Sequence, residues 1–93
     1  SSGERCMALS VAVAVGDEAG DALVEKMTEG MKGLSVGEYS NASNDFGPVI
    51  TLAHKEKVNG YIACAEKQGA TIVVDGRNPT VEGFENGFFV DAT

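Results

Sequence analysis

The chain has 93 residues, of which 43% are hydrophobic and 23% are charged, and its formal net charge is −7. A chain of this length suffices for one small domain, and a second domain does not fit. The acidic balance excludes nucleic acid as an expected partner, because the phosphate backbone would repel it. The apolar run at residues 7–15 is much shorter than the roughly 20 residues that cross a membrane, so we expect no membrane partner.

The few cysteines and the lone histidine limit the possible metal and disulfide sites. Cys6 and Cys64 are too few for a disulfide framework or a zinc site, so we expect a reducing compartment. His54 is the only histidine, which leaves no metal cluster and no cysteine–histidine pair of suitable spacing. The sequence also lacks a glycine-rich phosphate-binding motif. We therefore expect no metal ion and no cofactor to be held by this chain alone.

The first half of the chain predicts a strand followed by a helix. Larger apolar residues alternate with small ones over residues 9–15 without a charge on either face, which is typical of a strand covered on both sides. Asp17 and Glu18 then lie where a helix N-terminus favours acidic groups, and apolar residues recur at helical spacing behind them. We predict a helix over residues 18–32 and a turn-rich surface loop over residues 35–48.

The second half predicts a helix followed by two strands. Thr51 is suited to cap a helix that Gly69 would end. The β-branched residues 71–74 predict a buried strand, and the aromatic and apolar residues 88–90 predict a last short one. The order strand, helix, loop, helix, strand, strand is typical of part of an open α/β sheet.

Cys6 and Arg5 are the candidate functional residues, and each has two interpretations. A thiol beside a fixed positive charge and a turn of free N–H groups can act as a nucleophile, because the thiolate is the reactive form. A lone cysteine is more often a small buried hydrophobic residue. Arg5 is either solvated or able to hold a carboxylate in bidentate fashion. Cys64 is expected to pack in the core and His54 to be exposed.

Several segments follow one another along nearly the whole chain. They are GERCMALS at residues 3–10, VAVAVGDE at 11–18, NDFGPVIT at 44–51, GYI at 60–62, GATIVVDGR at 69–77 and GFENGFFV at 83–90. Together they resemble the segment around and after the nucleophilic cysteine in the catalytic domain of the aldehyde dehydrogenase superfamily. Within it the resemblance is closest to the CoA-acylating methylmalonate-semialdehyde dehydrogenases.

This resemblance implies a catalytic role for Cys6, which would attack an aldehyde carbonyl while its own backbone N–H helps to hold the oxyanion. Arg5 would bind the substrate carboxylate of malonate or methylmalonate semialdehyde. The complete enzyme would use NAD and coenzyme A, and would form acetyl-CoA or propionyl-CoA, CO2 and NADH. Glu4 would be structural or solvated, because the resembled enzymes take their general base from elsewhere.

The resembled enzymes are much longer than this chain. Their nicotinamide-binding domain, general-base glutamate and oxyanion-hole asparagine lie before the matched segment, and the contact with the cofactor ribose lies after it. We therefore expect a fragment that is inactive alone and that self-associates through open strand edges. The complete enzyme would be cytoplasmic, or mitochondrial in a eukaryote. The alternative is a stand-alone, non-catalytic binding or assembly module, which a reading frame bracketing these residues would favour.

Overall fold

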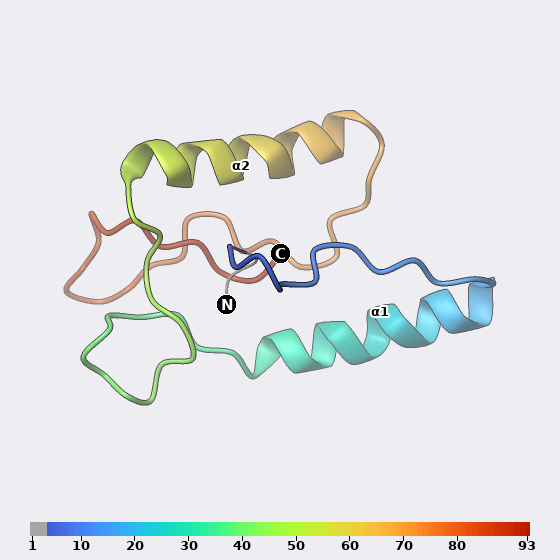
Figure 1. The fold of residues 1–93 in the computed structure, drawn as a ribbon, viewed down its shortest axis with the longest axis horizontal. Coiled ribbons are helices and arrows are strands. Elements are labelled where there is room, and N and C mark those ends of the chain that lie inside the picture. Colours follow the sequence, from blue (N-terminus) through green and yellow to red (C-terminus); the bar gives the residue numbers. More distant parts are fainter. Residues whose placement is uncertain (1–3) are drawn as a thin grey trace. The chain divides into compact units, whose positions relative to one another are not determined.

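The computed structural model describes residues 4–93, within which residues 4–33 and Leu34–Thr93 form two compact units. Over the described residues the regular elements are two helices, α1 (Asp17–Lys32) and α2 (Leu52–Lys67) (Figure 1). Irregular segments precede, join and follow them. Neither helix is both long and apolar enough to cross a membrane.

Helix α1 lies in the first unit and agrees with the prediction to within one residue at its start. Gly16 precedes it with φ +91°, a backbone angle that favours glycine. Asp17 and Glu18 occupy the first turn and Lys32 the last, so charges of both signs lie where the helix dipole stabilises them. No side chain of residues 4–33 is buried.

Helix α2 lies in the second unit and has the two ends that the sequence predicts. The hydroxyl of Thr51 accepts a hydrogen bond of 3.2 Å from the backbone N–H of His54, which caps the N-terminus. At the other end Gly69 has φ +93°. Its N–H donates to Glu66 O at 3.0 Å, and the N–H of Ala70 donates to Ala65 O at 3.0 Å. These paired bonds form a Schellman motif, so the predicted termination at Gly69 is confirmed.

The three predicted strands are not formed within residues 4–93, so the sheet of the expected α/β fold is not confirmed. Residues 9–15 make no backbone hydrogen bond to other described residues, and their larger apolar side chains are 80–97% exposed. Segments 71–74 and 88–90 also lack strand pairing. A strand exists only when a neighbouring strand takes up its N–H and C=O groups, and no such neighbour lies among the described residues. Among the described residues, one isolated parallel β-bridge joins Val36 and Phe46.

A small core lies in the second unit. Val49 and Phe89 are its buried hydrophobic residues. Their segments are joined by the backbone N–H of Val49, which donates to Phe88 O at 2.9 Å. This pairing brings the chain before α2 against the last apolar segment.

The predicted loop over residues 35–48 is confirmed, and local polar contacts hold its shape. The carboxylate of Glu38 accepts from the hydroxyl of Ser40 at 2.7 Å and from its backbone N–H at 2.9 Å. These bonds lower the pKa of Glu38 from its usual value, the hydroxyl bond contributing most. Asn44 donates to the carbonyl of Glu38 at 2.9 Å. Turn chemistry thus replaces regular structure here.

Candidate functional site

Arg5 and Cys6 lie in one exposed turn at the start of the described chain. The backbone N–H of Ala8 donates to Arg5 O at 2.9 Å, which places Cys6 at the second position of the turn. Both side chains are exposed, and the Cys6 thiol is free. The interpretation of Cys6 as a buried hydrophobic residue is therefore wrong for this chain, and solvent-borne reagents can reach its sulfur.

The turn also leaves a hydrogen-bond donor beside the thiol. Among residues 4–93 the backbone N–H of Cys6 donates to no other backbone group. A nucleophile with an open N–H on the same residue can attack a carbonyl and then donate to the oxyanion that forms. Met7 follows in the same turn and is itself 88% exposed.

Two expectations about other residues on α2 are corrected. Cys64 was expected in the core but is exposed, and its sulfur accepts from the side-chain amide of Gln68 at 3.2 Å. His54 was expected to be exposed and is half-buried. Within the described chain no three histidine, cysteine or acidic residues gather closely enough to hold a metal ion.

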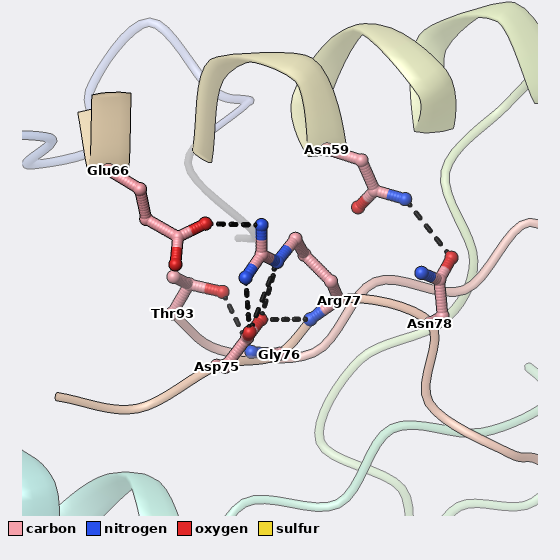
Figure 2. A network of polar contacts seen from close by, with 7 residues as sticks. All are labelled: Asn59, Glu66, Asp75, Gly76, Arg77, Asn78 and Thr93. Atoms are coloured by element: carbon pink, nitrogen blue, oxygen red, sulfur yellow. Dashed lines mark hydrogen bonds and ion pairs between the residues drawn. The ribbon is translucent and has the colours of Figure 1, made fainter. Parts of the chain in front are cut away.

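The structure shows a charged cluster that the sequence did not predict, centred on Arg77 (Figure 2). Nη1 of Arg77 lies 2.7 Å from Oε2 of Glu66 at the end of α2, and Nε lies 2.8 Å from Oδ1 of Asp75. The backbone N–H of Arg77 also donates to Asp75 Oδ1 at 3.1 Å. The sequence does contain one indication of this turn, because an aspartate two residues before an arginine can accept hydrogen bonds from it and so close a turn.

Arg77 lowers the pKa of Asp75 to about 2, first through its side-chain hydrogen bonds and then through its backbone N–H. The same bonds, with those to Glu66, raise the pKa of Arg77. Because the folded pKa of Asp75 lies below its unfolded value of 3.8, its stabilising contribution is complete above that value. The contribution is lost as the pH falls from there towards 2.

A carboxyl-carbon NMR titration should therefore place the pKa of Asp75 near 2 in the native chain. In the Arg77→Ala chain the pKa should move up from there towards 3.8, because the guanidinium donors are gone and only the backbone N–H of residue 77 remains. Glu66→Gln is the matched control, since it removes the other carboxylate and leaves the bonds between Arg77 and Asp75 in place. Identical titrations in the native and Arg77→Ala chains would contradict the assigned cause.

Comparison with known proteins decides the family. The aldehyde dehydrogenase family model matches residues 1–93. The chain belongs to the aldehyde dehydrogenase family. A malonate-semialdehyde dehydrogenase from Pseudomonas aeruginosa is 51% identical over 90 residues, which are 97% of this chain and 18% of that protein.

Two solved structures resemble this aldehyde dehydrogenase chain throughout. The methylmalonate-semialdehyde dehydrogenase from Oceanimonas doudoroffii has 71% sequence identity and a TM-score of 0.94, covering 99% of this chain and 19% of its own. An NAD complex of a Sinorhizobium meliloti 1021 protein assigned to the methylmalonate-semialdehyde dehydrogenases has 41% identity and a TM-score of 0.92, covering 97% of this chain and 18% of its own. The chain spans less than a fifth of the length of each relative.

Proposed function

We propose that this chain is the nucleophile-bearing segment of an NAD-dependent, CoA-acylating dehydrogenase of malonate or methylmalonate semialdehyde. The strongest support is its 71% identity, over 99% of its length, to the Oceanimonas methylmalonate-semialdehyde dehydrogenase. The exposed Cys6 thiol in a turn with Arg5 supports the same chemistry.

Cys6 is the proposed catalytic nucleophile. Its thiolate attacks the aldehyde carbon and forms a carbon–sulfur bond, while the carbonyl electron pair moves to oxygen. The Cys6 N–H donates to that oxyanion. When the oxyanion collapses, the aldehyde hydrogen leaves as hydride and a thioester remains on Cys6, so the substrate carbon is oxidised by two electrons. Attack by a second thiol then releases the acyl group and restores the thiolate.

Arg5 is the proposed ligand of the substrate carboxylate. A planar guanidinium can donate two parallel hydrogen bonds to a carboxylate, which fixes the substrate's orientation as well as its position. Arg5 directly precedes the nucleophile and its side chain is exposed. A semialdehyde that carries its carboxylate close to its aldehyde could therefore meet both residues of this turn.

The cofactors are proposed to bind to parts of the enzyme outside this chain. In the complete enzyme NAD would accept the hydride and coenzyme A the acyl group, and the carboxylated products would lose CO2. The sequence supplies no phosphate-binding glycine motif and the described residues show no cluster for a metal ion. The proposed contribution of this chain is the thiol, the guanidinium and their positioning. A reducing compartment, the cytoplasm or a mitochondrion, would keep both free cysteines reduced.

Residues 9–15, 71–74 and 88–90 are proposed to become strands of an open α/β sheet in the complete enzyme. Their side chains are uncharged, and Leu9 to Val15 expose their larger apolar groups almost completely. Such segments gain stability when neighbouring strands pair with both edges and other elements cover both faces. The short run that links Cys6 to α1 would then hold the nucleophile on a rigid support.

The isolated chain is expected to form no NADH from malonate semialdehyde, NAD and coenzyme A, because it holds no hydride acceptor beside Cys6. The complete enzyme under the same conditions should form NADH and acetyl-CoA in equal amounts. Absorbance at the NADH band and mass spectrometry of the acyl-CoA check the two products. NADH formation by the isolated chain that disappears on alkylation of Cys6 would refute the first expectation, and free acetate in place of acetyl-CoA would refute CoA acylation.

The isolated chain is also expected to self-associate through residues 9–15, most simply as a two-fold dimer. An apolar segment with unpaired backbone groups is a template for pairing with a second chain. Size exclusion with light scattering at micromolar concentration measures the mass. Val13→Lys should shift the chain towards the monomer, because a charge on this segment opposes pairing. A sharply eluting native monomer of 9.6 kDa would exclude the idea.

A further inference from the structure

One face of α2 carries a row of polar side chains that hold the irregular segments of the second unit. Lys55, Asn59 and Glu66 follow at spacings of four and seven residues, which places them on one side of the helix. Nζ of Lys55 lies 3.4 Å from Gly87 O, and Nδ2 of Asn59 lies 3.1 Å from Oδ1 of Asn78. Glu66 completes the row through its ion pair with Arg77 at 2.7 Å.

Arg77 makes the most extensive of these attachments. Its guanidinium bonds Glu66 on one side and both carboxylate oxygens of Asp75 on the other, as Figure 2 shows. The Arg77 side chain is only 23% exposed, against 44% for Glu66 and 45% for Asp75. The other two attachments are a bond between neutral amides and a 3.4 Å bond from the lysine ammonium to a carbonyl, and neither joins two opposite charges.

The turn that Arg77 closes also fixes the last residues of the chain. Between Asp75 and Arg77 lies the buried Gly76, whose N–H donates to Oγ1 of Thr93 at 3.0 Å. Its carbonyl accepts from the N–H of Asp91 at 2.8 Å. A Cβ on Gly76 would overlap the backbone of residues 91 and 92. The two backbones therefore meet so closely that a change in the turn must be transmitted to residues 91–93.

We propose that Arg77 fastens residues 75–78 and 91–93 to α2, and that these two segments open together when its ion pairs are lost. Gly76 has no side chain, so its own contact with residues 91–93 depends on the hydrogen bonds to Thr93 and Asp91. Segments held mainly by polar bonds open locally at much lower free energy than a packed core. This inference concerns how the chain is held together and is independent of the reaction proposed above.

Amide hydrogen exchange of the complete protein, measured by mass spectrometry, tests the proposal. Arg77→Ala should speed exchange in peptides covering residues 75–78 and 91–93 by about three- to tenfold, in parallel, and leave α1 unchanged. Arg77→Lys keeps the charge but not the fork of donors, so it should produce a smaller increase in the same two segments. If the Arg77→Ala variant does not fold, the Arg77→Lys variant still tests the proposal.

Lys57→Ala is the matched control, because Lys57 is a cation on α2 that lies over the ring of Tyr61 and outside the Arg77 cluster. It should leave both segments at the native exchange rate. An increase confined to residues 75–78 would show that the two segments are not coupled. Unchanged exchange in both segments would overturn the proposal. A uniform increase throughout the protein would also overturn it.

Discussion

Cys6→Ala is expected to abolish dehydrogenase turnover in the complete enzyme. Without the thiol no covalent bond to the aldehyde carbon can form, and removal of a covalent nucleophile lowers kcat by about a thousandfold or more. In this chain Cys6 lies in an exposed turn and packs in no core, so the substitution removes no buried contact that the described residues show. Steady-state NADH formation measures the loss, and calorimetric titration with NAD checks that cofactor binding survives.

Cys64→Ala provides the matched control for this experiment. Cys64 is also a free, exposed cysteine, but it lies on α2 and its sulfur accepts a hydrogen bond from Gln68. We expect its replacement to leave kcat within about twofold of the native value, because surface substitutions outside a site have small effects. Native-like turnover by Cys6→Ala, or an equal loss in both variants, would show that Cys6 is not the nucleophile.

The helices could be predicted from the sequence because their signals are local. Thr51 lies three residues before the N–H that it caps, and Gly69 adopts a positive φ that few other residues tolerate. Asp17 and Glu18 marked the start of α1 in the same way. Each of these signals acts within one helical turn, so neighbouring residues suffice to interpret it.

The strands and the charged cluster depend on partners that a local pattern does not contain. Alternation over residues 9–15 indicates which faces would be covered, but pairing requires a second strand, and none lies among residues 4–93. Arg77 meets Glu66 across eleven positions of sequence, a pairing set by the path of the chain after Gly69. The prediction that Cys64 packs in the core is wrong for a related reason. Its alanine neighbours did not show that the less exposed face of α2 runs through Val58, Asn59 and Ile62.

The site itself was predictable only in part. The sequence singled out Cys6 and Arg5 as adjacent candidates, and the structure places them together in one exposed turn. Adjacency alone could not decide between a buried thiol and a reactive one. The structure places the thiol in the turn closed by the bond from Ala8 to Arg5, and there it is free and exposed.

Arg5→Ala in the complete enzyme is expected to raise KM for malonate semialdehyde roughly tenfold to a hundredfold while changing KM for propanal little. Only the semialdehyde presents a carboxylate, and a charge-assisted hydrogen-bonded pair contributes about 1.5–3 kcal/mol to binding. Because both aldehydes use the same nucleophile, the ratio of their kcat/KM values isolates the carboxylate contact from any general damage to the turn.

Arg5→Lys distinguishes charge from geometry in the same assay. Lysine keeps the positive charge but lacks the planar fork of donors, so it should restore only part of the preference for the semialdehyde. Full restoration would mean that Arg5 acts as a simple point charge. Equal losses for both aldehydes in the alanine variant would show that Arg5 supports the turn around Cys6 rather than the substrate, since a shift of the thiol affects every aldehyde alike.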